Sequence, residues 1–324
     1  MTKFSIISLT LFLALSLSSC DDSGIVQTKN NVSFTYSNLK HLDPDVDGVY
    51  EAWISFDSQA DHGDELYVSC GKFNIDPNNG ELVDTAGNPV TLKLKYIPST
   101  INTAGDAIVT IEPPFDTDTL PSTRLIGGAV TAGSDFLSAD MDMKYDEVLG
   151  EIADNFTIAG TKYILNTPTD TSVQFYYNGI WFCDTAGTSL FTGLLPIADS
   201  LGWTYEAWVT DTRTGTNYSL GRFSNPDSTD SDAAGQYANP PYSIAYGKPG
   251  QDYIRNTPPV SDLRAGYYRL MITLEPKNEP ANSPPFFIRL FYRQQLQPLQ
   301  YGENSPGLPN MSADLPTATI KVSK

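Results

Sequence analysis

The sequence predicts an all-β protein made of two tandem antiparallel β-sandwich domains of the immunoglobulin-like or jelly-roll-like kind. Three observations lead to this class. One block of sequence occurs twice, and the apolar runs are short and rich in Tyr, Phe, Val, Ile and Thr. Pro, Gly, Asn, Asp, Ser and Thr interrupt nearly every run, so little helix is expected. About 300 residues remain after an N-terminal signal, which suits two domains of roughly 100 to 150 residues.

The first element is an export signal. Residues 1–19 have a basic start followed by the apolar stretch Phe4–Leu17, which is too short to span a bilayer comfortably. The end of this stretch, Leu17-Ser18-Ser19-Cys20, resembles the bacterial lipobox. That resemblance implies cleavage before Cys20, acylation of this cysteine, and a tether over residues 20–30. An ordinary signal peptide that contains a cysteine by chance is the alternative interpretation.

The repeat comes next and decides the domain organisation. Tyr50-Glu51-Ala52-Trp53-Ile54 returns as Tyr205-Glu206-Ala207-Trp208-Val209. Two further matches keep the same order, Gly71-Lys72-Phe73 with Gly221-Arg222-Phe223 and Ile108-Val109-Thr110-Ile111-Glu112-Pro113 with Met271-Ile272-Thr273-Leu274-Glu275-Pro276. The loops between these landmarks differ in length, as surface connections do. The sequence therefore predicts a first sandwich over residues 31–145, a linker over 146–159 and a second sandwich over 160–324.

Alternation assigns faces to the repeated strands. Residues 90–96 alternate between apolar and polar side chains, as a half-buried strand does, and 266–274 form a longer strand candidate. Within the motif, Tyr50, Ala52 and Ile54 share one face, which we expect to be the core, and Trp53 lies on the other. A sugar ring could stack on Trp53, but a Trp present at the same place in both copies is explained more simply by packing.

Net charge limits the class of partner that this chain can bind, and the cysteine positions indicate the state of the thiols. The net charge is −18 and no basic cluster is present, so nucleic acid is excluded as a partner. With Cys20 lipidated, only Cys70 and Cys183 remain, at non-equivalent places in the two repeats. Two buried free thiols are the expected state, and a disulfide in an oxidising compartment is the alternative.

One acidic turn resembles the start of a calcium loop. Asp43, Asp45 and Asp47 precede a Gly at the spacing at which alternate oxygens can converge on a hard cation. The twelfth position, where a bidentate Glu is needed, is Ile54. Calcium binding by these three residues is thus a hypothesis beside that of a solvated turn, and no other cofactor is expected.

No catalytic constellation is recognisable, so we expect a protein that is not an enzyme. The two histidines, His41 and His62, lie in polar loop sequence without a partner at metal-ligand spacing. The sequence has neither a nucleophile elbow nor a phosphate-binding loop. With 38 acidic residues, however, a carboxylate pair acting as acid and base stays open.

The order Tyr-Glu-x-Trp, Gly-basic-Phe, Glu-Pro and a Ser/Pro loop resembles the extracytoplasmic C-terminal domain of anti-sigma-K factors. The resemblance implies a β-sandwich in each copy. Those factors also carry a cytoplasmic sigma-binding domain and a membrane-spanning helix, and neither has a counterpart here. No direct contact with a sigma factor is therefore expected, and the resemblance implies little about activity.

Three functions remain as hypotheses. The first is a non-catalytic, lipid-anchored protein of the bacterial cell envelope, facing the periplasm or the exterior, which presents its sandwiches to an envelope protein or glycan. The second is an extracytoplasmic sensor or regulatory module of an anti-sigma-type signalling system. The third, and least favoured, is a carboxylate-dependent hydrolase.

Overall fold

The all-β class is confirmed by a computed structural model that describes residues 31–57, 65–96, 104–170, 173–235, 238, 246–253, 260, 262–280 and 282–323. The lipidation residue Cys20 and the tether, residues 20–30, lie outside the described residues. The strands are β1 (Val32–Ser37), β2 (Val49–Asp57), β3 (Glu65–Ile75), β4 (Leu82–Val83), β5 (Ala104–Glu112), β6 (Thr123–Ala129), β7 (Thr131–Ala132), β8 (Phe136–Asp142), β9 (Gly160–Thr161), β10 (Ile164–Leu165), β11 (Gly179–Trp181), β12 (Phe191–Thr192), β13 (Trp203–Asp211), β14 (Thr216–Phe223), β15 (Gly250–Asp252), β16 (Tyr268–Pro276), β17 (Arg289–Arg293) and β18 (Thr317–Ser323). The helices are α1 (Glu151–Phe156) and the 3₁₀ turns η2 (Val173–Asn178), η3 (Asp199–Leu201) and η4 (Ser312–Asp314).

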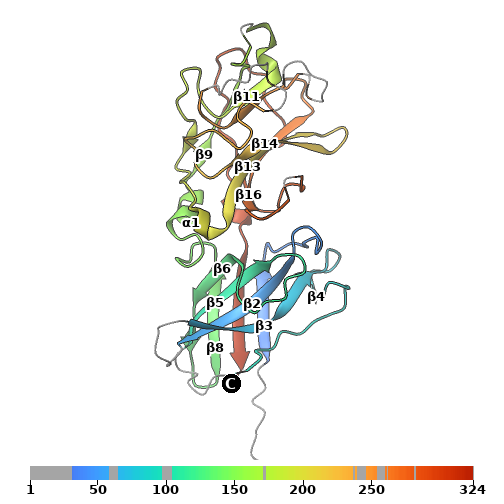
Figure 1. Cartoon of the computed structure of the whole chain (residues 1–324), viewed down its shortest axis with the longest axis vertical. Coiled ribbons are helices and arrows are strands. Elements are labelled where there is room, and N and C mark those ends of the chain that lie inside the picture. The colour runs from blue at the N-terminus through green and yellow to red at the C-terminus, as the bar shows by residue number, and fades with distance from the viewer. Residues whose placement is uncertain are drawn as a thin grey trace, which may run out of the picture.

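Two lobes are stacked end to end (Figure 1). The first lobe contains β1 to β8 together with β18, and the second lobe contains α1 and β9 to β17. The first lobe is built on one antiparallel sheet in the order β1-β18-β8-β6-β5-β2-β3-β4, with β7 beside β8. The last strand of the chain, β18, therefore completes the first lobe, pairing with β1 on one side and β8 on the other. The predicted second domain, residues 160–324, is too long at its C-terminal end, because residues 317–323 belong to the first sheet.

The sheet of the first lobe curls until its distant strands face each other across the core. Phe34 of β1 packs edge-on against Phe73 of β3, with ring centroids 5.2 Å apart, although five strands separate β1 from β3 in the sheet order. Residues 90–96, which were expected to form a strand, lie between these two layers without regular pairing. Leu92 and Leu94 are buried while their neighbours are exposed. The alternation predicted which side chains are buried, and it was wrong about the regular strand.

The repeated sequence corresponds to the same four strands in each lobe. The order β3-β2-β5-β6 in the first lobe is matched by β14-β13-β16-β17 in the second. The registers agree as well: Glu51 pairs with Thr110 in one lobe, and Glu206 pairs with Thr273 in the other. In the second lobe this four-stranded sheet packs with two small sheets, β10-β11-β15 and β9-β12.

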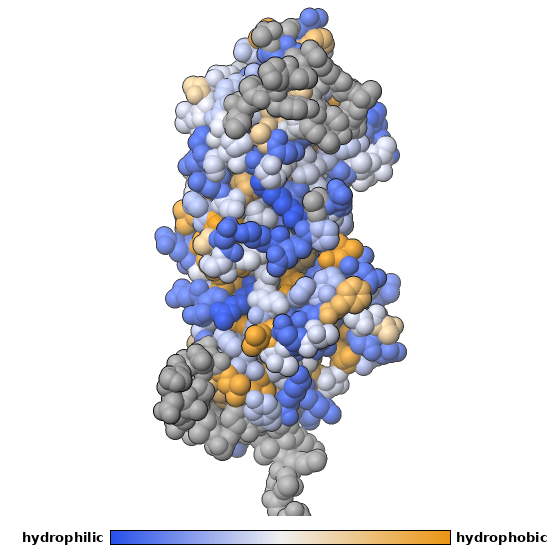
Figure 2. Space-filling model, viewed as in Figure 1, coloured by the Kyte–Doolittle hydropathy of each residue, from blue (hydrophilic) through white to orange (hydrophobic). Residues whose placement is uncertain are grey.

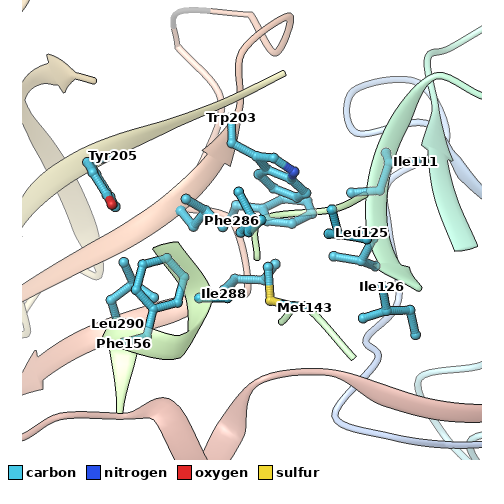
Figure 3. Close-up of a cluster of buried hydrophobic side chains, with 14 of the residues drawn as sticks. Ile111, Leu125, Ile126, Met143, Phe156, Trp203, Tyr205, Phe286, Ile288 and Leu290 are labelled. Carbon is cyan, nitrogen blue, oxygen red and sulfur yellow. The ribbon is translucent and has the colours of Figure 1, made fainter. Parts of the chain in front are cut away.

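The lobes share one continuous hydrophobic core rather than being joined by a free linker. At the junction, Trp203 and Phe286 of the second lobe lie beside Leu125 of the first (Figure 3). The Trp203 indole N–H also donates to the Arg124 carbonyl, with a distance of 2.9 Å between nitrogen and oxygen. Part of the predicted linker, residues 146–159, forms α1, whose Phe156 is buried in this core. The connection is therefore a packed element of the structure.

Candidate functional site

The aromatic residues of the repeat are structural in both lobes. The hydroxyl groups of Tyr50 and Tyr205 donate to the Lys40 and Leu195 carbonyls, each at 2.8 Å. The indole N–H of Trp53 donates to Thr110 Oγ1, and that of Trp208 donates to Thr273 Oγ1, both at 2.9 Å. Trp53 is 2 % exposed and Trp208 4 %, so neither ring is available for stacking on a sugar. The face assignment is confirmed, since Tyr50, Ala52 and Ile54 belong to the main core while Trp53 is buried on the opposite face.

The repeated glutamates are buried and take part in matched polar contacts. Ser69 donates to Glu51, and Ser219 donates to Glu206, which also forms an ion pair with Arg222 at 2.6 Å. Burial raises the pKa of both glutamates. The serine oxygens in turn accept the backbone N–H of Gly71 and Gly221, both of which have positive φ at a β-bulge. This bulge explains why Gly precedes the basic residue in both copies.

The Glu-Pro pairs end the third repeated strand in the same way. Glu112 accepts the hydroxyl of Thr110 and the backbone N–H of Ser122. Glu275 accepts the hydroxyl of Thr273 and the backbone N–H of Phe286. Each carboxylate thus holds the chain returning from the loop that begins at Pro113 in the first lobe and that follows Pro276 in the second. The repeat markers are explained by the fold, and they do not form a binding site.

The carboxylates of the acidic turn accept hydrogen bonds from the backbone of the turn itself. The Asp43 carboxylate accepts the backbone N–H of Asp45 at 3.0 Å, and the Asp47 carboxylate accepts that of Asp43 at 2.9 Å. These oxygens cap the turn instead of converging on one point. Among the residues that the structure describes, no three acidic, His or Cys side chains are grouped so that they could hold a metal ion. Calorimetry with millimolar calcium still tests the hypothesis directly.

Acidic side chains do converge where the lobes meet. Asp47 of the first lobe and Glu275 lie beside the Glu279 carboxyl group, which forms an ion pair with Arg222 at 3.3 Å. Burial and the adjacent Glu275 raise the pKa of Glu279 to about 10. The adjoining cavity, lined by both lobes, has a volume of about 80 Å³. It holds only a few water molecules at about 30 Å³ each, whereas substrate pockets measure roughly 300 to 1,000 Å³. The geometry therefore favours a structural role for this cluster over hydrolysis.

The cysteines and the described histidine take structural positions. Cys70 and Cys183 are free and buried, as expected, and burial raises the pKa of each thiol to about 12. A ring nitrogen of His41 lies 2.9 Å from the Ile75 carbonyl oxygen. His62 lies outside the described residues.

The strongest candidate for a binding site is a groove on the second lobe, which we call the outer groove. It has a volume of about 400 Å³ and is formed by the face of β13, β16 and β17 that carries Trp208, together with the loop before β17. Met271 and Phe287 give it an apolar floor and wall. Its lining is Thr210, Thr212, Gly215, Asn217, Arg269, Met271, Pro284, Pro285, Phe286, Phe287, Arg289 and Tyr292.

The outer groove contains two arginines and no acidic residue, although the chain has a net charge of −18. The guanidinium carbons of Arg269 and Arg289 lie 5.8 and 5.4 Å from the centre of the Tyr292 ring. Within the described part of the chain, neither arginine makes an ion pair, and the Arg269 Nε is buried without a hydrogen-bond partner. A buried donor without a partner is costly, so this site is suited to an anionic ligand.

Sequence reasoning missed these two arginines. Alternation along Tyr268-Arg269-Leu270-Met271 does place Arg269 and Met271 on one face, the face that also carries Trp208. The absence of a carboxylate partner depends on contacts between strands far apart in the sequence. No local signal in the sequence could have shown that these cations are unpaired.

On the face drawn in Figure 2, hydrophilic residues surround small hydrophobic patches. Comparisons with protein-family models, with curated proteins and with solved structures return no match. The resemblance to the anti-sigma-K outer domain therefore stays a prediction. Within the described residues, no helix has the length and hydrophobicity needed to cross a membrane.

Proposed function

We propose that this protein is a lipid-anchored extracytoplasmic protein of the cell envelope that binds a protein or glycan partner and catalyses no reaction. The location rests on the export signal and on Cys20 at the end of a sequence resembling a lipobox. The binding role rests on one observation, the outer groove with two arginines that make no ion pair among the described residues.

The position of the groove suits a partner approached from the side away from the anchor. Val32, near the start of the described chain, pairs with Val322 at the C-terminal end of the first lobe. Figure 1 shows this C-terminal end at the bottom of the first lobe, with the second lobe, which contains β11 and β13, above it. The outer groove belongs to the second lobe, so a tether entering at β1 leaves the groove at a distance from the membrane.

The chemistry of the lining supports binding rather than catalysis. The described lining has two threonine hydroxyl groups, Thr210 and Thr212, and no His, Cys, Asp or Glu to activate them. Its other groups are three aromatic rings, two guanidinium groups, one Asn amide and further apolar side chains. These groups recognise a ligand and hold it, as at the centres of protein interfaces.

Photocrosslinking in intact cells tests the proposal. A photoreactive amino acid replaces Thr212, which is exposed at the groove, and in a matched control it replaces Thr131, which is exposed on β7 of the first lobe. We expect a discrete adduct from position 212 only, and its loss when Cys20→Ala prevents anchoring. The same adducts at both positions, or none at position 212, would contradict a binding role for this groove.

A further inference from the structure

The repeated four-stranded sheet has an equivalent outer face in each lobe. The residues of the two faces can therefore be matched position by position. In the first lobe Thr110 pairs with Arg124, and in the second Thr273 pairs with Arg289. A β-bulge adjoins each of these pairs. Arg124 and Arg289 are therefore equivalent residues of the repeated fold, at the same place on the same face.

In the first lobe this face is covered by a segment of the protein's own chain that comes after β8. The Glu147 carboxylate forms an ion pair with the Arg124 guanidinium at 2.6 Å. Tyr145 donates its hydroxyl to Asp106, and the side chains of Tyr145 and Val148 lie directly over Gly127. Residues 145–148 thus supply one carboxylate for the arginine and two larger side chains for the apolar part of the face.

In the second lobe no described segment takes that place. Arg289 is exposed, Arg269 is half-buried, and the groove of about 400 Å³ remains over them. The position equivalent to Gly127 is Tyr292, as the pairs Ile108 with Gly127 and Met271 with Tyr292 show. The ring of Tyr292 lies between two cations where the first lobe has one cation and its carboxylate partner.

We propose that the outer groove binds a short acidic peptide segment of a partner protein, in the way that the turn at residues 145–148 covers the matching face of the first lobe. This inference rests on the proposed binding function and specifies the ligand class. Carboxylate side chains of the peptide pair with Arg269 and Arg289, whose planar guanidinium groups can each bind a carboxylate through two hydrogen bonds. A neighbouring apolar side chain of the peptide packs on Met271 and Phe287.

The first lobe also supplies a probe for the test. A fluorescent peptide copying residues 144–150, with the sequence Lys-Tyr-Asp-Glu-Val-Leu-Gly, is titrated with the full-length mature protein in detergent. The matched control peptide carries Asn and Gln in place of its Asp and Glu. We expect the acidic peptide to bind with a Kd on the order of 10 to 100 μM, as short, weak contacts do. The neutral peptide should bind at least about tenfold more weakly, since it lacks charge-assisted pairing.

Variants of the protein locate the binding. The double variant Arg269→Ala with Arg289→Ala should lower the affinity for the acidic peptide about tenfold or more. Arg289→Ala alone should cause part of this loss and leave folding intact, because the Arg289 side chain is exposed. The charge-matched control, Lys93→Gln with Lys162→Gln, changes two exposed cations elsewhere and should leave binding unchanged. Rising salt should weaken binding to the wild type.

Several outcomes would overturn the inference. Equal binding of both peptides, no binding of the acidic peptide at 1 mM, or full binding by the double arginine variant each contradict an acidic-peptide groove. Binding of polygalacturonate but not of the peptide would replace the ligand class with an acidic glycan. Association of two copies, detected by size-exclusion chromatography and lost with Arg289→Ala, would make a second copy the occupant. In any of these cases a crosslinked partner at position 212 would leave the proposed function standing.

Discussion

The first lobe covers its outer face with its own chain, whereas no described segment covers the equivalent face of the second lobe. Both faces are built from the same four strands in the same register, so the difference lies in the segments that connect and extend those strands. In the first lobe, Glu147 neutralises Arg124. In the second, Arg269 and Arg289 have no carboxylate partner within the described chain. The two copies of the fold therefore differ in their connecting segments, as surface loops do, while their strands keep the same register.

The lobes also differ in how they are completed, and removal of β18 should have the largest effect. A chain ending at Pro316 lacks the strand between β1 and β8, and with it the buried side chains of Ala318, Ile320 and Val322. Burial of two large aliphatic side chains and one small one contributes about 5 kcal/mol to the free energy of unfolding. Because the lobes share one core, urea denaturation should show this loss as a lower midpoint of the single unfolding transition. An unchanged unfolding curve would show that the first lobe does not need the last strand.

The junction between the lobes should be the next most sensitive place. Trp203→Ala removes a buried ring at the junction and leaves the Arg124 carbonyl without its donor. We expect a loss of about 3 to 5 kcal/mol and separation of one unfolding transition into two. Trp208→Ala is the matched control, because it removes a buried Trp of the same lobe away from the junction and should lower stability without separating the transitions. Two transitions already present in the wild type would contradict a shared core.

The glycines at the two matched bulges should differ in their tolerance of a methyl group. A Cβ at Gly221 would lie 2.8 Å from the Asp230 carboxyl group, whereas one at Gly71 would meet only Leu92, at 3.5 Å. Both substitutions carry the cost of positive φ, about 1 to 2 kcal/mol. Gly221→Ala should therefore be the more destabilising by about a further 1 kcal/mol or more. Equal losses in thermal unfolding would show that Asp230 moves aside freely.

The lobes predict opposite pH responses at matched acidic positions, four residues after the Glu of each Glu-Pro pair. Lys72 lowers the pKa of Asp116 in the folded state. The contribution of Asp116 to stability is therefore present above its unfolded-state pKa and is lost as the pH falls through its folded-state pKa. Burial and Glu275 raise the pKa of Glu279 to about 10, so its contribution is present below the unfolded pKa and is lost as pH rises toward 10.

The thermal midpoint of the wild type should fall between pH 5 and 9, and it should fall less in Glu279→Gln. For a net effect of about 1 kcal/mol, the fall should be smaller by about 2 to 4 °C in the variant. Asp116→Asn should instead lower the midpoint at neutral pH and leave the alkaline decline as it is. Identical slopes in the wild type and Glu279→Gln would place the titrating group elsewhere.

Sequence patterns predicted the local part of this structure. The order of the repeated landmarks, the faces of Tyr50 and Trp53, and the all-β class were predictable from spacing and alternation within single strands. The partner of residues 317–323 was not, because their alternation identifies a strand and not the sheet that it joins. The outer groove was missed for the same reason, since whether a described carboxylate reaches Arg269 depends on strands and loops that are distant in sequence.

Arginine modification measured site by site tests the difference between the two faces most directly. The protein is treated with phenylglyoxal, and the modification rates of Arg124 and Arg289 are monitored by mass spectrometry with and without the acidic peptide of residues 144–150. Arg289 should react several-fold faster than Arg124, whose guanidinium is held by Glu147, and the peptide should protect Arg289 alone. Equal rates at the two arginines, or a peptide that protects neither, would contradict a covered face in one lobe and an open binding face in the other.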